Sequence, residues 1–269
     1  MADARDRSRE WDADTYHQVS GPQHAWGVRV LERLELRGGE HVLDAGCGTG
    51  RVTHALHART RESGGRVTAL DRSTEMTRVA RRTLPADVPV IVADLLAIPF
   101  HRAFDVVFST ATFHWVLDPA ALYRSLATVL RAGGRLHAQC GGAGNCGRLH
   151  RRVAALCATA RFAARFAGWT DPWCFLAPGE AERFLQSAGF APVRTWLEPE
   201  PTPFPNRDAY RVFVEHVVLR SWMARFGVGD AEAAAFLDAV CDAGALDDEP
   251  FTLDYVRLNI EAGLPRAVA

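Results

Sequence analysis

Short apolar segments alternate with helical patterns along the first half of the chain, and this alternation limits the possible folds more than any other feature. The apolar segments have the length and composition of buried strands: His41 to Ala45, Val67 to Leu70, Val88 to Ala93, Phe104 to Phe108 and Leu136 to Cys140. Because a helix between two strands acts as a crossover, strands joined in this way run parallel and need cover on both faces. The pattern predicts an α/β fold with a doubly wound, mostly parallel sheet.

The second half of the chain has a different pattern. Residues 148–167 and 206–243 have helical spacing, whereas Val193 to Glu198 and Phe251 to Ile260 have strand composition. We therefore expect a helical cap inserted into the C-terminal half of the sheet, with the Pro-rich stretch 199–205 as a hinge or linker. The expected organisation is an N-terminal arm or lid over 1–24, an α/β core over 25–142, a helical cap over 143–178 and 200–250, and the rest of the core over 179–199 and 251–269.

The charged residues exclude several classes of function. The sequence has no lysine, so all 31 basic residues are arginines, and chemistry that needs a Lys Schiff base or a P-loop Lys is excluded. Since 32 acidic residues bring the formal net charge to -1, we expect neither nucleic acid nor a membrane as a partner. The Lys-free, Arg-rich composition hints at a GC-rich bacterial source, which makes a role in secondary metabolism conceivable.

The six cysteines form no CxxC pair and no compact spacing with histidine. We therefore expect reduced thiols and no metal site. The N-terminal segment is charged and lacks the apolar stretch of a secretory signal, and no run of about 18 apolar residues is present for a membrane span. These features predict a cytoplasmic protein, as a monomer or homodimer.

A Gly-rich turn follows the first predicted strand, with the sequence Asp44-Ala-Gly-Cys-Gly-Thr-Gly50. A dinucleotide-binding turn has the spacing G-x-G-x-x-G, but the sixth position counted from Gly46 is Arg51. Three alternating glycines with a carboxylate two residues before them suit a ligand that lies against bare backbone and carries positive charge. A glycine turn that serves packing alone is the alternative.

This turn resembles the first motif of the class I S-adenosylmethionine-dependent methyltransferases, acidic-x-G-x-G-x-G, a family with a Rossmann-like fold. The resemblance implies S-adenosyl-L-methionine as the cofactor and S-adenosyl-L-homocysteine as its product. It implies that Asp44 faces the methionine amino group, that Asp71 accepts hydrogen bonds from the ribose hydroxyls, and that Asp94 accepts one from the adenine amino group. The other implied cofactor-binding residues are Gly46, Cys47, Gly48, Gly50, Arg72, Leu95 and Ser109.

Two of the three acids also have simpler interpretations. Asp71 precedes Ser73 at the start of a predicted helix and could be a helix cap, and Asp94 could be a solvated loop acid. Three acids at the ends of three successive predicted strands are nevertheless a more specific signal than the glycines alone.

The segment after the fourth predicted strand, Ser109 to Val116, lacks the [DN]PP[YF] tetrad, which disfavours methylation of DNA adenine or protein glutamine. The stretch from Val107 to Leu136 instead resembles the trans-aconitate methyltransferase branch, in which a similar segment ends in His-Trp. That branch methylates a carboxylate oxygen of small organic acids, and its relatives modify natural products. The resemblance covers residues 10–142 well, extends to the predicted strand Phe251 to Ile260 and becomes weak in the predicted cap.

The candidate acceptor-side residues each have two interpretations. His114 is the candidate general base if a proton must leave the acceptor, or else a packed residue beside Trp115. Tyr16 is a candidate catalytic lid residue, or else part of an exposed tail. The aromatic residues that could form the wall of an acceptor pocket, or simply a core, are Trp115, Trp169, Trp173 and Phe175. Arg148, Arg151 and Arg152 could bind an anionic acceptor or form a solvated helix face.

Taken together, these residues predict methyl transfer to a small molecule, on an oxygen of a carboxylate or hydroxyl of an organic acid or natural-product intermediate. The alternatives are a C-methyltransferase, or a cyclase or binding protein that keeps the cofactor site without methylating.

Overall fold

The structure is a computed structural model that describes residues 11–227 and 229–266. The chain divides into two compact units. Among the described residues, the sheet unit comprises 21–143, 173–198 and 257–266, and the helical unit comprises 11–20, 144–172, 199–227 and 229–256. The sheet unit carries every residue of the predicted cofactor site.

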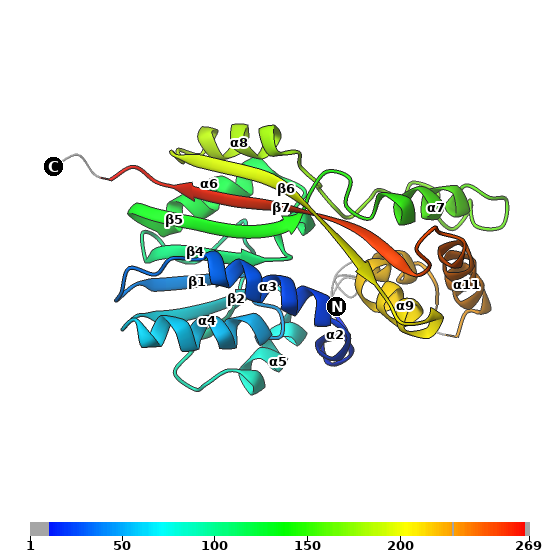
Figure 1. Cartoon of the computed structure of the whole chain (residues 1–269), viewed down its shortest axis with the longest axis horizontal. Helices are drawn as coiled ribbons and strands as arrows, with labels where there is room; N and C mark the ends of the chain where they lie inside the picture. The colour runs from blue at the N-terminus through cyan, green and yellow to red at the C-terminus, as the bar shows by residue number, and fades with distance from the viewer. Residues whose placement is uncertain (1–10, 228, 267–269) are drawn as a thin grey trace, which may run out of the picture. The chain divides into compact units, whose positions relative to one another are not determined.

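Seven strands among the described residues form one sheet in the order β3-β2-β1-β4-β5-β7-β6 (Figure 1). The strands are β1 (His41–Ala45), β2 (Arg66–Asp71), β3 (Val90–Val92), β4 (Phe104–Thr110), β5 (Leu130–Gly141), β6 (Val193–Pro203) and β7 (Thr252–Gly263). The first five strands pair in parallel, and β7 runs antiparallel to β5. The predicted α/β fold with a mostly parallel sheet is confirmed.

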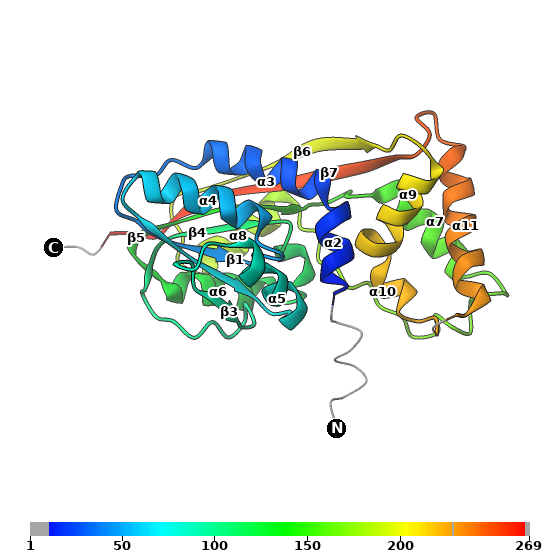
Figure 2. The same cartoon turned by 90° about the horizontal axis from the view of Figure 1, so that it is seen from below.

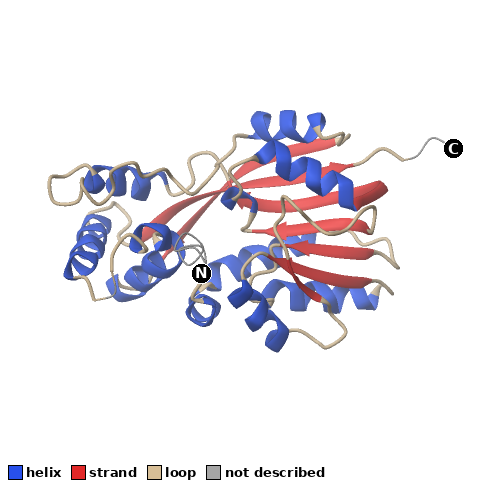
Figure 3. Ribbon diagram, turned by 180° about the vertical axis from the view of Figure 1, so that it is seen from behind, coloured by secondary structure: helices blue, strands red, loops and turns tan. Residues whose placement is uncertain are grey.

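Helices cover both faces of the sheet. The helices α3 (Gly21–Arg33), α4 (Arg51–Glu62) and α5 (Thr74–Thr83) share one buried cluster with the sheet, and α6 (Pro119–Val129) and α8 (Pro178–Ser187) share the other (Figures 1 and 3). Alternation along β4 shows the two-sided burial: Val106 and Phe108 belong to the first cluster and Val107 to the second. Such burial on both faces explains why the strands appear in the sequence as nearly continuous apolar runs.

The Pro-rich stretch 199–205 begins where the chain passes from the sheet unit to the helical unit, and residues 199–203 belong to strand β6, so its role as a hinge or linker stays a prediction. Strand β6 extends through Pro199, Pro201 and Pro203. It lies at the edge of the sheet, where a residue without a backbone N–H leaves no ladder hydrogen bond unmade. Prolines in a sequence argue against a strand, but a strand at the edge of a sheet tolerates them.

The helical unit contains α2 (Ala13–Val19), α7 (Gly147–Cys157), α9 (Arg207–Phe213), the π-helical turn η2 (Val214–Val218), α10 (Arg220–Met223) and α11 (Ala231–Ala245) (Figure 2). Its core includes the mutually packed rings of Phe162, Phe166, Phe226 and Phe236. Helix α2 begins after Asp12, whose side chain accepts a hydrogen bond from the Thr15 N–H. The part of the predicted arm that the structure describes therefore includes a capped helix. Across residues 11–227 and 229–266, no helix is both long and apolar enough to span a membrane.

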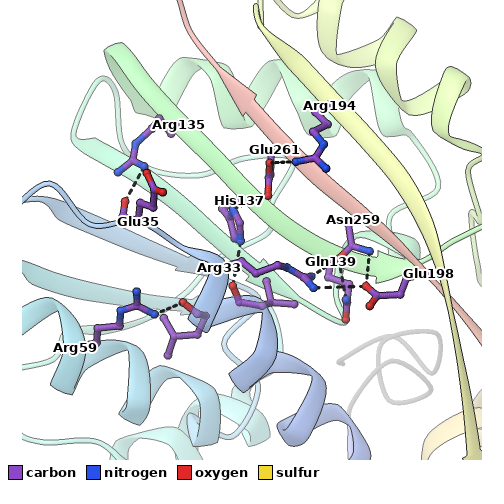
Figure 4. Close-up of polar contacts among 12 residues, drawn as sticks. Arg33, Glu35, Arg59, Arg135, His137, Gln139, Arg194, Glu198, Asn259 and Glu261 are labelled. Atoms are coloured by element: carbon purple, nitrogen blue, oxygen red, sulfur yellow. Dashed lines mark hydrogen bonds and ion pairs between the residues drawn. The ribbon is translucent and has the colours of Figure 1, made fainter.

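A network of polar side chains joins α3 to strands β5, β7 and β6 of the sheet (Figure 4). The side-chain oxygen of Asn259 accepts hydrogen bonds from Arg33 (2.5 Å) and Gln139 (2.9 Å), and its amide nitrogen donates to Glu198 (3.1 Å). Asn259 and Gln139 are almost fully buried, so each of these bonds satisfies a group that water does not reach. The network connects α3 with β5, β7 and β6.

Candidate functional site

The turn between β1 and α4 lies at the carboxyl ends of the parallel strands, where doubly wound sheets bind ligands. The backbone N–H groups of Gly46 and Cys47 both donate to the carbonyl of Leu70 at the end of β2, at 2.7 and 2.9 Å. The turn is therefore fixed to the neighbouring strand.

The three glycines of this turn have positive φ angles but different surroundings. A Cβ on Gly46 would lie 2.2 Å from the side chain of Thr112, and a Cβ on Gly50 would lie 3.0 Å from Leu84. A Cβ on Gly48 would meet no atom within 4 Å. Gly46 and Gly50 thus serve packing, whereas Gly48 leaves open space beside the backbone, as a bound molecule would require.

Asp44 is a buried carboxyl group at the end of β1, with 2% of its surface exposed. The hydroxyl of Thr53 on α4 donates to it at 2.6 Å. Burial, together with the nearby Asp71, raises the pKa of Asp44 to about 7, against the opposing effect of that hydrogen bond. A cationic group of a ligand beside Asp44 would favour the ionised carboxylate.

Asp71 connects the end of β2 to the glycine turn. One carboxylate oxygen accepts from the Gly48 N–H and the other from the Ser73 N–H, both at 2.9 Å. Burial raises the pKa of Asp71, while these two backbone donors act in the opposite direction. The helix cap of α5 itself is Ser73, which accepts from Met76 N–H. Asp71 therefore positions the turn in addition to any ligand contact.

The remaining predicted cofactor residues lie in varied surroundings. Asp94 is exposed after β3 and accepts from the Leu96 N–H at 2.9 Å, and Leu95 beside it is buried. Arg72 is exposed. Cys47 is buried, and burial holds the pKa of its thiol well above the ordinary value. The hydroxyl of Ser109 donates to the carbonyl of Ala45 at 2.6 Å, so it joins β4 to β1 within the sheet.

The structure brings four predicted acceptor-side residues together in the sheet unit. His114 lies in the 3-10 turn η1 (Phe113–Trp115), its ring 5.7 Å from the ring of Phe175 and 5.5 Å from that of Trp115. Trp173 packs 5.6 Å from Trp115 and 5.5 Å from Phe175. The Cys174 N–H donates to the His114 carbonyl at 2.8 Å, which ties the segment 173–175 to the turn.

The ring of His114 is nearly buried, and its Nδ1 atom accepts a hydrogen bond of 3.2 Å from the Gly141 N–H at the end of β5. An Nδ1 that accepts carries no proton, so the neutral ring carries its proton on Nε2. Burial and the charge of Arg257 hold the pKa of His114 well below its usual range. This geometry argues against the predicted role as a general base and favours a neutral ring that donates from Nε2.

The other predicted acceptor-side residues belong to the helical unit. Trp169 packs against Trp222 and Phe166, at 5.1 and 6.1 Å, and Tyr16 lies in α2 with its ring 5.1 Å from Trp11. Their roles at the acceptor stay predictions.

The arginine group at 148–152 includes two residues in ion pairs within this unit. Arg148 pairs with Asp254 at 3.7 Å, and Arg152 pairs with Asp247. These contacts favour a structural role for both side chains.

Three residues of the site were not predicted from the sequence. Thr53 and Thr112 hold Asp44 and the carbonyl of Gly46, but hydroxyl residues after a glycine turn or a strand are too common to single out. Arg257 in strand β7 is 2% exposed. A buried charge within a strand is rare, but the same strand also contains Asp254 and Glu261, so the sequence alone does not single out Arg257.

Comparison with known proteins agrees with this geometry. Residues 43–138 match a family model described as "Methyltransferase domain". An uncharacterised methyltransferase of Schizosaccharomyces pombe is 31% identical over 192 residues, which are 67% of this chain and 70% of that relative. The trans-aconitate 2-methyltransferase of Shigella flexneri is 32% identical over 130 residues, 48% of this chain and half of that relative's length. The YcgJ protein of Bacillus subtilis has a similar fold, with a TM-score of 0.59 and 17% identity over 91% of this chain and 99% of that one.

Proposed function

Since the chain belongs to the class I S-adenosylmethionine-dependent methyltransferases, we propose that it transfers the methyl group to a carboxylate oxygen of a small organic acid. The observation that carries the choice of acceptor is the hydrogen bond from the Gly141 N–H to Nδ1 of His114. A carboxylate is already ionised near neutral pH and needs no base. Hydroxyl and carbon acceptors must lose a proton, and the neutral Nε2–H form of His114 does not accept it.

The residues of the glycine turn fit the cofactor. The buried carboxyl of Asp44 supplies a partner for the methionine amino group, and the open space at Gly48 admits a molecule against the backbone. Asp71 keeps the Gly48 N–H in place and has further lone pairs for ribose hydroxyls. Asp94 and Leu95, after β3, would contact the adenine.

Bound S-adenosylmethionine supplies a methyl group on a positively charged sulfur, and its transfer to a carboxylate oxygen yields S-adenosylhomocysteine and a neutral ester without proton transfer. The protein contributes alignment and exclusion of water. The aromatic cluster of Trp115, Trp173 and Phe175 supplies an apolar wall for the acceptor. His114 donates a hydrogen bond to an acceptor oxygen and stays neutral while doing so. The protein would act in the cytoplasm.

The relatives are compatible with this proposal. The trans-aconitate 2-methyltransferase of Shigella flexneri matches 130 residues of this chain, and the alignment spans half of that relative's length.

The test is to incubate the protein with S-adenosylmethionine and a panel of mono-, di- and tricarboxylic acids, including trans-aconitate. Parallel reactions contain phenols, alcohols and amines of similar size. We expect S-adenosylhomocysteine and a product heavier by one methylene in the acid reactions. Alkaline hydrolysis distinguishes the products, because it releases methanol from a methyl ester and leaves a methyl ether or a C-methyl group intact. Methylation of the phenols, alcohols or amines with none of the acids would overturn the proposal.

A further inference from the structure

We propose that the guanidinium group of Arg257 binds the carboxylate of the acceptor and selects anionic acceptors over neutral ones. Nε2–H of His114 is the second donor to the same group. The inference rests on the proposed function for the identity of the acceptor, but it concerns a residue outside the cofactor site. It assigns a specificity role to a strand that the family model, which ends at residue 138, does not cover.

Arg257 and His114 both lie beside Gly141. Arg257 on β7 is the pairing partner of Gly141 in the antiparallel β5–β7 ladder. The backbone N–H of Gly141 donates to Nδ1 of His114. The backbone of Arg257 and the ring of His114 therefore both lie at the carboxyl end of β5.

The side chain of Arg257 is held on the face of the sheet that α3 covers. Its guanidinium carbon lies 4.7 Å from the centre of the Trp26 ring. Trp26 is buried in α3, and further along the same helix the Val30 carbonyl contacts His137 of β5. Helix α3 thus places its N-terminal half toward the carboxyl end of β5. The contact with Trp26 uses the face of the guanidinium group, whereas guanidinium groups bind carboxylates through the planar edge.

The charges suit an anion at this point. Arg257 is close enough to lower the pKa of the His114 ring, so its field reaches the centre of the aromatic cluster. The reacting sulfur of the cofactor is also positive. An acceptor with one carboxylate oxygen near the guanidinium and the other near the methyl group would lie between two positive charges. A neutral alcohol or ester of the same shape gains nothing from this arrangement.

The experiment compares the wild-type protein with Arg257→Met, Arg257→Lys and the control Arg194→Met. Arg194 is an arginine of the neighbouring strand β6 whose side chain is 73% exposed, so it matches the chemical change without altering the buried guanidinium. Two kinds of measurement are made on each protein. The first is KM and kcat for the carboxylic acid that the wild type methylates best. The second is the affinity for that acid, or for trans-aconitate if there is no turnover, by calorimetry with S-adenosylhomocysteine present.

We expect Arg257→Met to raise KM and weaken acid binding by about 30-fold or more, as the loss of a charge-assisted hydrogen-bond pair would. Arg257→Lys should retain part of the affinity, because it keeps the charge but loses the planar fork. The control should match the wild type, and calorimetry with S-adenosylmethionine should show an unchanged cofactor affinity in all variants. If Arg257→Met fails to fold, Arg257→Lys alone decides, since an unchanged KM in that variant overturns the inference.

The two proposals fail in different ways. Acid methylation with the same KM in the Met and Lys variants would overturn the role of Arg257 and leave the proposed function standing. Acid binding that depends on Arg257, without methyl transfer to any acid, would support the role of Arg257 and contradict the proposed function. Absence of acid binding to the wild type would overturn the role of Arg257 directly.

Discussion

The Gly141 N–H donates a hydrogen bond to Nδ1 of His114 across 3.2 Å. This contact fixes the tautomer of the ring as well as its orientation, because a nitrogen that accepts here cannot also carry a proton. The base catalysis that a histidine beside a cofactor commonly suggests is therefore disfavoured at this position, and hydrogen-bond donation takes its place.

The first prediction concerns substitutions of His114. Glutamine can keep a donor near the position of Nε2–H, whereas alanine removes it, so His114→Gln should retain about tenfold more activity on an acid acceptor than His114→Ala. The measurement is kcat/KM for each variant. If the ring were a general base, the two variants would be equally inactive, and the wild-type rate would fall as His114 became protonated.

The second prediction concerns pH and the cofactor. The pKa of Asp44 is raised to about 7, and the methionine amino group binds the ionised form. Affinity for S-adenosylmethionine should therefore fall below pH 7, by at most about tenfold per pH unit. Calorimetry at pH 6, 7 and 8 tests this, with Asp44→Asn as the control, whose weaker binding should not show the same dependence.

Without the cofactor, the same group makes stability depend on pH in the opposite sense to an ordinary paired acid. The folded pKa of Asp44 lies above the unfolded value of 3.8, so between these two values the folded state binds more protons. The contribution of Asp44 to the free energy of unfolding should thus decrease as pH rises from about 4 to 7. Denaturant titrations of wild type and Asp44→Asn would isolate it, and identical pH profiles would contradict the prediction.

The third prediction separates the glycines of the turn. Gly46→Ala places a Cβ against Thr112 and should destabilise the protein by roughly 2 kcal/mol or more. Gly48→Ala meets no neighbouring atom and should cost about 1 kcal/mol from its positive φ. It should weaken cofactor binding well beyond that small loss of stability. Thermal unfolding and calorimetry on both variants would show whether the two effects separate.

The fourth prediction compares two acids of the site. Asp71→Asn places an amide against two backbone N–H groups, so it should disturb the turn and weaken cofactor binding by about 30-fold or more. The matched substitution Asp94→Asn changes an exposed residue with one local backbone contact and should have a smaller effect. Undiminished binding by Asp71→Asn would count against the assigned cofactor site.

Much of the sheet unit was predictable because two-sided burial leaves apolar runs of strand length in the sequence. The predicted strand His41 to Ala45 has the observed bounds. The edge strand β6 was predicted too short, since prolines are depleted in strands generally and only its position in the sheet makes them acceptable.

The candidate site was predictable where a local motif carried it and not where the fold assembled it. The glycine turn follows the first predicted strand and Asp71 follows the second, so both are visible in the sequence as residues at strand ends. The pairing of Arg257 with Gly141 joins residues 116 positions apart through an antiparallel ladder, and no local spacing encodes it. The direction of the His114 hydrogen bond likewise depends on where β5 ends.

The polar network around Asn259 also affects where Arg257 points. Asn259 lies opposite Gln139 in the β5–β7 ladder and follows Arg257 by two residues along β7. The side chains of Arg257 and Asn259 therefore lie on the same face of the sheet, toward α3. A slip of β7 by one residue against β5 would turn Arg257 into the apolar layer under α6 and α8 and leave the buried amide of Gln139 without Asn259. Asn259 therefore penalises the wrong register, and an amide remote from the cofactor determines on which side of the sheet the buried charge is presented.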